Sequence, residues 1–284
     1  MIWSNFGAQN LIDLAHAGVP AQMVSMPLAG ATAPVTLVGA VVQHAAECLS
    51  GLTIHQLAKP GAPIVWGGAP AIFDMRKGTT PMGAIETAMI DASYSQLGKF
   101  LGLPTHTYLG ASDAKVIDAQ AGLESGISAV IGALAGVNMI SGAGMLDFLA
   151  CFSFEKLVID AEIVAMAKRL LAGMGTPTET LATAMFEGIN FKGDFLKQKL
   201  TRELFSSEQY LPSKVIDRDS IRGWHQEGSM DTLARAKIQV NQLLSQYSIP
   251  SLPHDKVQDL QNLVKHHAIE AGMITLPVFD QYSQ

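Results

Sequence analysis

Acidic and amide side chains gather in two stretches that each follow a predicted β-strand. The first stretch contains Asp74 and Arg76, and the second contains Asp118, Gln120 and Glu124. Enzymes built from repeated βα units carry their chemistry in the loops after the strands, so these five residues are candidate site residues. Because the carboxylates cluster, we expect the ligand to carry positive charge.

Each of these residues also has a purely structural interpretation. Asp74 and Arg76 could form a loop ion pair, and Asp113 or Asp118 could cap the following helix. Glu47 lies in an apolar helical segment and needs a polar partner, for which a neighbouring helix or loop is the simpler choice. The sequence leaves both interpretations open.

Aromatic residues lie near the same loop ends. Trp66, Phe73 and Tyr108, together with Phe148 and Phe152, could offer π faces to a quaternary ammonium group. The alternative is that each packs in the core, as single aromatic residues usually do. We predict substrate contacts for Asp74, Arg76, Trp66, Phe73 and Tyr108.

Several classes of function lack their signatures. The net charge of −6 comes without a basic block, which argues against nucleic-acid binding. No HExxH motif or spaced Cys/His set predicts a metal site, and no GxSxG motif or Cys–His constellation predicts a hydrolase. Glycine turns after the strands could cradle a phosphate, which leaves a barrel enzyme acting on phosphorylated substrates as a third possibility.

Composition favours a globular protein with a partly covered surface. Hydrophobic residues make up 48% of the 284 residues and charged residues only 15%, so we expect association, as in a homo-oligomer. Two cysteines make no disulfide framework, which favours the cytoplasm. The ranges 14–46 and 125–146 lack charges, but prolines or glycines interrupt them as in buried strands and helices, so we predict no membrane insertion.

Four short β-branched or aromatic runs recur every 30 to 40 residues, each followed by a glycine turn and an Ala-rich helical segment. This spacing is typical of βα units and predicts a parallel sheet. Thr80 and Ser153 are predicted to cap two of the helices. The runs are Val19–Pro27, Pro63–Trp66, Thr105–Leu109 and Val137–Ile140.

The C-terminal part has a different character. Residues 229–247 and 256–272 have the periodicity of amphipathic helices, so we divide the chain into a partial barrel domain, 1–205, and a helical extension, 206–284. Four βα units are half of an eight-stranded barrel of about 250 residues. The predicted fold is therefore α/β, a (β/α)8 TIM-barrel type that lacks its N-terminal strands.

Short motifs, in matching order along nearly the whole chain, resemble the trimethylamine methyltransferase (MttB-like) family. They are Met26-Pro-Leu-Ala-Gly-Ala-Thr-Ala-Pro-Val-Thr-Leu-Val-Gly39, Ala46-Glu-Cys-Leu-Ser-Gly51, Gln56 with Pro60-Gly-Ala-Pro63, Asp74-Met-Arg76, Gly102-Leu-Pro104, Asp113-Ala-Lys115 with Asp118-Ala-Gln120, Ser153-Phe-Glu-Lys156 with Asp160, and Ile216-Asp-Arg218 with Trp224 and Gly228.

The resemblance implies a barrel enzyme that transfers a methyl group from a methylamine or a quaternary amine, such as a betaine, to the cobalt of a corrinoid. A partner protein carries that corrinoid, so no cofactor is expected to be bound tightly by this chain. The resemblance also implies that the chain corresponds to the C-terminal part of the family's usual length. On this basis Asp118, Gln120 and Glu124 are the predicted catalytic residues.

Two departures from the family pattern affect the predicted substrate. Ordinary residues, Ala121-Gly-Leu123, stand near the family's pyrrolysine position, so the chain resembles the branch without pyrrolysine and favours quaternary amines. In 193–201, Asp194, Gln198 and Leu200 occupy places where the family often has histidines. The rival hypothesis is a truncated, non-catalytic half-barrel that acts as a binding or scaffold protein.

Overall fold

Four strands pair in parallel, in the order in which they occur along the chain. In the computed structural model, β1 (Ala21–Ser25) pairs with β3 (Ile64–Gly68), and β5 (His106–Thr107) pairs with β6 (Met139–Ile140). A parallel bridge between Trp66 and Thr105 joins the two pairs. Each strand lies within or overlaps one of the four predicted runs, so the predicted parallel βα succession is confirmed.

The structure describes residues 2–174, 183–186, 189, 193–250 and 252–275. The chain forms two compact units, 1–241 and 242–284, and the first contains the sheet. Within the described residues the parallel strands form an open row that ends at β1 and β6, and they do not close into a barrel. The α/β class is therefore established, and the barrel type remains a proposal.

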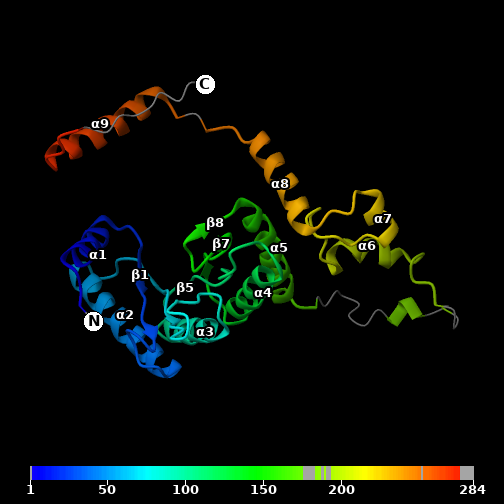
Figure 1. Ribbon diagram of the computed structural model, residues 1–284, viewed down its shortest axis with the longest axis horizontal. Helices are drawn as coiled ribbons and strands as arrows, with labels where there is room; N and C mark the ends of the chain where they lie inside the picture. Colours follow the sequence, from blue (N-terminus) through cyan, green and yellow to red (C-terminus); the bar gives the residue numbers. More distant parts are fainter. Residues whose placement is uncertain (1, 175–182, 187–188, 190–192, 251, 276–284) are drawn as a thin grey trace. The chain divides into compact units, whose positions relative to one another are not determined.

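A helix follows each parallel strand, and one more precedes the first strand (Figure 1). Each helix packs on the next one along the chain, from α1 to α5, so the helices form a continuous layer. Their bounds are α1 Asn5–Ala17, α2 Leu37–Ala58, α3 Ile85–Phe100, α4 Ala119–Leu134 and α5 Phe154–Leu171.

Short strands extend this arrangement at the loop ends. β2 (Leu28–Ala29) and β4 (Ala71–Ile72) form a second parallel pair after β1 and β3. An antiparallel pair, β7 (Met145–Leu146) and β8 (Cys151–Phe152), lies between β6 and α5. The connections after the strands are thus ordered by their own pairing.

The two predicted helix caps have different outcomes. Ser153 caps α5 as predicted, because its hydroxyl accepts a hydrogen bond from the Lys156 amide. Thr80 does not cap α3, which starts at Ile85 after Ala84 and has no side-chain cap. The prediction was wrong because the amides of Met82 and Gly83 are bound by Asp113 from another loop and are not available to a helix turn.

The alternating side chains of the strands face two different environments. Ala21, Met23, Ile64 and Trp66 belong to the core between the sheet and its helices. Trp66 is fully buried, and its indole N–H donates to the carbonyl of Tyr94 on α3. The alternate residues of β1 and β3, including Gln22, point to the opposite face of the sheet.

Helix α2 contributes polar groups to this core. His44 is fully buried, stacks on Tyr94 with ring centroids 4.2 Å apart, and its Nε2–H donates to the Gly67 carbonyl. A Cβ at Gly68 would lie 2.4 Å from His44 Nε2, so glycine is required there for the helix to approach the strand. Among the described helices, α2 alone is long and apolar enough to span a membrane; it packs here on β1 and β3.

The remaining helices follow the sheet-containing segment. They are η1 Thr183–Phe186, α6 Lys199–Glu208, α7 Ile221–Gln226, α8 Thr232–Gln246 and α9 His254–Glu270. The last two confirm the amphipathic helices predicted in 229–247 and 256–272. Tyr210 donates a hydrogen bond to Glu162 of α5, and Val215 is buried. The division predicted after residue 205 stays a prediction.

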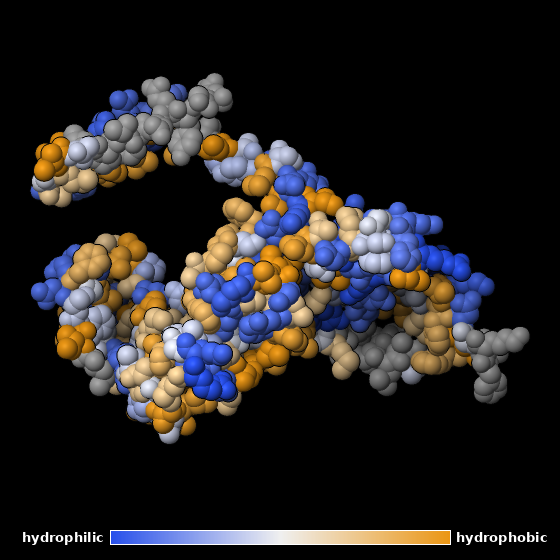
Figure 2. All heavy atoms as spheres, in the orientation of Figure 1, coloured by the Kyte–Doolittle hydropathy of each residue, from blue (hydrophilic) through white to orange (hydrophobic). Residues whose placement is uncertain are grey.

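Large apolar side chains remain exposed on the helical layer. Val38, Leu57, Phe100, Leu123 and Leu134 are each more than 60% exposed. Figure 2 shows hydrophobic residues interspersed with hydrophilic ones over the visible surface. This exposure is the kind of surface expected of a chain that associates, although the homo-oligomer stays a prediction.

Candidate functional site

A polar row crosses the sheet on the face opposite the helices. Gln22 of β1 donates from its amide Nε2 to Nδ1 of His106 on β5 over 2.9 Å, and His106 Nε2 lies 2.6 Å from the Ser141 hydroxyl after β6. The row passes over Gly67 of β3, where a Cβ would lie 3.2 Å from His106 Nδ1. Glycine in the middle strand therefore lets side chains of β1 and β5 meet.

The contacts of His106 define its protonation state. An amide nitrogen can only donate, so Nδ1 accepts from Gln22 and Nε2 carries the proton that is donated to Ser141. Burial lowers the pKa of His106. The row therefore presents a neutral imidazole, which does not repel a cationic ligand.

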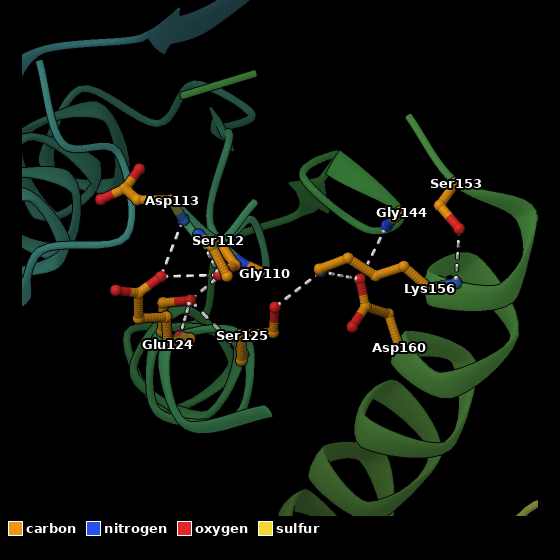
Figure 3. A network of polar contacts seen from close by, with 11 residues as sticks. Gly110, Ser112, Asp113, Glu124, Ser125, Gly144, Ser153, Lys156 and Asp160 are labelled. Atoms are coloured by element: carbon orange, nitrogen blue, oxygen red, sulfur yellow. Dashed lines mark hydrogen bonds and ion pairs between the residues drawn. The ribbon is translucent and has the colours of Figure 1, made fainter. Parts of the chain in front are cut away.

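Two carboxylates link the loops after β4 and β5 to helix α4. Both oxygens of Asp113 accept backbone hydrogen bonds, from Met82 and Gly83. Glu124 Oε2 accepts from the Ser112 hydroxyl at 2.6 Å and from the Asp113 amide at 2.7 Å. In Figure 3 the side chain of Glu124 points from α4 toward Ser112 and Asp113.

The environment of Asp113 changes its acidity. Burial raises its pKa to about 6, the backbone hydrogen bonds from Gly83 and Met82 act in the opposite direction, and the neighbouring Glu124 charge raises it further. A carboxyl group with such a pKa can exchange a proton near neutral pH. Both oxygens of Asp113 already accept from backbone amides, so its evident role in this cluster is to position the loop that contains Met82 and Gly83.

A buried ion pair fixes the turn after β6. Lys156 Nζ on α5 lies 2.5 Å from Asp160 Oδ2 and 2.8 Å from the Ser125 hydroxyl of α4. The same Asp160 oxygen accepts from the Gly144 amide at 2.7 Å (Figure 3). This network ties α4, α5 and the loop together, which is a positioning role.

Three groups that attract cations surround the ammonium of Lys115: an aromatic ring, a carboxylate and a carbonyl oxygen. It is 3.7 Å from the centroid of the Phe148 ring, 2.9 Å from Asp147 Oδ1 and 2.7 Å from the Asp113 carbonyl oxygen. Asp147, Phe148 and Leu149 all have positive φ, between 48° and 70°. Three successive non-glycine residues in this conformation are strained, so the loop shape is held by its contacts.

The predicted catalytic residues lie together, with one of them in a capping role. Gln120 donates from Nε2 to Glu124 Oε1 at 2.8 Å, so these two side chains meet. The carboxylate of Asp118 accepts from the Gln120 and Ala121 amides and caps α4. The structural interpretation therefore accounts for Asp118, and the catalytic assignments of all three stay predictions.

Asp74 and Arg76 form the loop ion pair that was the alternative interpretation. Arg76 Nη2 lies 2.9 Å from Asp74 Oδ2, and the Arg76 side chain is 88% exposed. Hydrogen bonds from the Arg76 side chain and backbone lower the pKa of Asp74 to about 2. Each group already has its partner, and their substrate contacts stay predictions.

The predicted aromatic residues do not share one environment. The ring of Tyr108 packs edge-on to His106, with centroids 4.9 Å apart, on the polar row. Phe73 is half-buried after β4. Trp66 is buried on the helix side of β3, away from the row, so the structure places it in the core and not on the face that carries His106.

The loop ends nevertheless converge on a common apolar cluster. Residues that follow β1, β3, β5 and β6 pack together there, so the connections after all four parallel strands lie at one end of the sheet. They are Leu28, Ala69, Ala71, Met82, Tyr108 and Leu149.

A Cys–His contact that the sequence did not predict is chemically inert. Cys48 Sγ lies 3.5 Å from His44 Nε2, and both side chains are buried. Burial raises the pKa of the Cys48 thiol to about 12 and lowers the pKa of His44 to about 4. Both groups are neutral near pH 7, so the pair offers no thiolate nucleophile.

Sequence reasoning missed the polar row, although it left a signal. Gln22 and His106 lie within two of the predicted strands, at positions that alternate with apolar or β-branched residues. Alternation places both on the same face once the strands are parallel neighbours. In the described part of the chain, no group of three or more His, Cys, Asp or Glu side chains is placed to hold a metal ion.

Comparison with known proteins gives a consistent family. The chain is 38% identical to trimethylamine methyltransferase MttB2 of Methanosarcina mazei over 258 residues, which is 90% of this chain and 51% of the relative. It is 32% identical to trimethylamine methyltransferase MttB of Desulfitobacterium hafniense over 95% of this chain and 54% of the relative. It is 33% identical to a glycine betaine methyltransferase of Desulfitobacterium hafniense over 92% of this chain and 54% of the relative.

The chain spans about half the length of the curated relatives it matches. The family model for trimethylamine methyltransferase (MTTB) matches residues 1–272, which include the sheet, the polar row and the carboxylate cluster. The chain therefore belongs to the trimethylamine methyltransferase family.

Proposed function

We propose that this chain provides the amine-binding part of a methyltransferase that takes a methyl group from a quaternary or tertiary amine. The relatives named as methyltransferases of trimethylamine and of glycine betaine support this substrate class. The acceptor is a corrinoid carried by a partner protein in the cytoplasm. The whole enzyme is a (β/α)8 barrel, of which residues 1–205 form four βα units and 206–284 a helical extension.

The observation that carries the proposal is the setting of the Lys115 ammonium. An aromatic face, a carboxylate and a carbonyl oxygen surround it, from Phe148, Asp147 and Asp113. The same chemistry recognises quaternary ammonium ligands, which cannot donate hydrogen bonds and depend on π faces and negative charge. In this proposal the methylated ammonium group of the substrate takes the place of the Lys115 ammonium, whose side chain is 59% exposed and can move into solvent.

In this proposal the residues of the chain act by positioning and electrostatics. The Phe148 ring and the Asp147 carboxylate stabilise the substrate cation in place of water, after Lys115 has moved away. Asp113 and Glu124 hold the neighbouring loops in register, and Gln120 donates to the second carboxylate oxygen of Glu124. When bound, the corrinoid supplies the nucleophilic metal centre that accepts the methyl group.

The test is isothermal titration calorimetry, in which the purified chain is titrated with tetramethylammonium or with glycine betaine. Replacing Phe148 with alanine removes the ring. We expect the affinity to fall about tenfold, because a cation–π attraction of about 1.4 kcal/mol corresponds to a factor of about ten in the dissociation constant. Asp147→Asn should weaken binding similarly. The matched control is Asp259→Asn on α9, an exposed carboxylate that should leave binding unchanged. Equal affinity of Phe148→Ala and the parent chain would refute the site.

A second candidate function follows from the open row of strands. Because β1 and β6 lack a further partner among the described strands, the chain could serve as a non-catalytic half-barrel that binds or scaffolds another polypeptide. Absence of binding for every amine tested, together with formation of a stable protein complex, would favour this candidate.

A further inference from the structure

The groups that surround the Lys115 ammonium keep their arrangement without the lysine. This cation seat consists of the Phe148 ring, the Asp147 carboxylate and the Asp113 carbonyl oxygen. Main-chain hydrogen bonds tie the two loops that carry it, from the Asp147 amide to the Ala114 carbonyl and from the Ser112 amide to the Met145 carbonyl. These bonds do not involve the side chain of Lys115, so the seat remains when that side chain moves.

Lys115 differs from the buried lysine of the same region in its freedom to move. Its side chain is 59% exposed, and its ammonium ends a flexible four-carbon stem. Lys156 is 1% exposed and is fixed in the pair with Asp160. Because Lys115 belongs to the same loop as Asp113, a ligand that takes the cation seat leaves a mobile positive charge directly beside itself.

The carboxylates of the surrounding loops already have partners. Both oxygens of Asp113 accept from backbone amides, and both oxygens of Glu124 accept hydrogen bonds from neighbouring groups. Asp147 is paired with the ligand once the cation seat is filled. A negative group on the ligand itself is therefore the natural new partner of the Lys115 ammonium.

We propose that Lys115 is a specificity-determining residue, whose displaced ammonium binds the carboxylate of a zwitterionic quaternary amine. The inference rests on the proposed function, because it requires the methylated ammonium group to occupy the cation seat. In glycine betaine one methylene separates the quaternary nitrogen from the carboxylate, so the seat holds the nitrogen while Lys115 holds the carboxylate. A simple quaternary cation gives Lys115 no new partner and only competes with it for the seat.

The test compares glycine betaine with choline by isothermal titration calorimetry of the purified chain. Both ligands carry a trimethylammonium group, and choline has a hydroxyl in place of the carboxylate. We expect the parent chain to bind glycine betaine about tenfold more tightly, the factor that corresponds to one hydrogen bond between charged groups.

Two variants of Lys115 separate its charge from its bulk. Lys115→Met should abolish the preference for glycine betaine over choline. The same variant should bind tetramethylammonium more tightly than the parent chain does, because the competing ammonium is gone. Lys115→Arg keeps a positive charge and should keep the preference for glycine betaine.

The matched control is Lys256→Met on α9. Lys256 is 64% exposed and pairs with Asp259, much as Lys115 pairs with Asp147, and its replacement should leave all affinities unchanged. Equal affinities of the parent chain for glycine betaine and choline, or an unchanged preference in Lys115→Met, would overturn the inference and leave the amine site in place. Weaker tetramethylammonium binding by Lys115→Met would also overturn it, because the lysine would then support the seat. Binding of none of the three ligands would overturn the proposed function and the inference together.

Discussion

Replacing Lys156 with methionine tests whether the buried ion pair holds the sheet-containing unit together. Lys156 is only 1% exposed, and its ammonium is the charged partner of Asp160. Methionine keeps the aliphatic volume and removes the charge, so Asp160 is left buried without its cation. Loss of one partner of a buried pair costs about 3–5 kcal/mol, which we expect as the decrease in the free energy of unfolding.

The pH dependence of this cost gives an independent check. Burial raises the pKa of Asp160, and the Lys156 charge opposes that shift. Without Lys156 the pKa of Asp160 in the folded state rises further. The variant is therefore least destabilised below about pH 4, the pKa of Asp160 in the unfolded chain, and it loses stability as the pH rises through the folded-state pKa. We therefore expect a smaller cost at pH 5 than at pH 8.

The assay is urea unfolding monitored by tryptophan fluorescence, which reports on the core of this unit because Trp66 lies in it. The double variant Lys156→Met, Asp160→Asn should recover most of the loss, since the amide oxygen can still accept from Gly144. Lys197→Met removes an exposed lysine from a surface pair and should change stability by less than about 0.5 kcal/mol. A loss below about 1 kcal/mol for Lys156→Met, or the same loss at both pH values, would refute the reasoning.

Two further predictions concern the loops of the site. The folded-state pKa of Asp113 is raised to about 6, so protonation of Asp113 stabilises the folded state at low pH, and this contribution is lost as the pH rises from about 4 to 6. Asp113→Asn should therefore make the free energy of unfolding less dependent on pH in that window, as measured by urea unfolding. At Gly142 a Cβ would lie 2.1 Å from the Tyr108 carbonyl oxygen, so Gly142→Ala should lower the melting temperature sharply. Gly122→Ala, in open space on α4, should instead stabilise by about 0.5–1 kcal/mol, and similar melting shifts for the two variants would contradict the packing argument.

The order and type of the main elements followed from local sequence patterns. Four short β-branched runs alternate with long Ala-rich segments, and each run overlaps one parallel strand. Ser153 was recognisable as a cap because the signal is local: a hydroxyl three residues before the amide it accepts from. Thr80 carries the same signal and failed, since Asp113, distant in sequence, binds the amides that follow it.

The site depended on contacts that local patterns do not encode. The sequence placed Gln120 and Glu124 four residues apart on one helix, and they do meet. It could not place Gln22 against His106, 84 residues away, or His106 against Ser141, 35 residues away.

The amino-acid sequence by itself determined where the four main parallel strands and the last two helices lie, and which side chains of a strand share a face, because these follow from short periodicities. Only the tertiary structure decided which of those side chains meet. The register of neighbouring strands and the absence of a side chain at Gly67 bring Gln22 and His106 together, and burial then sets the charge of the groups that meet.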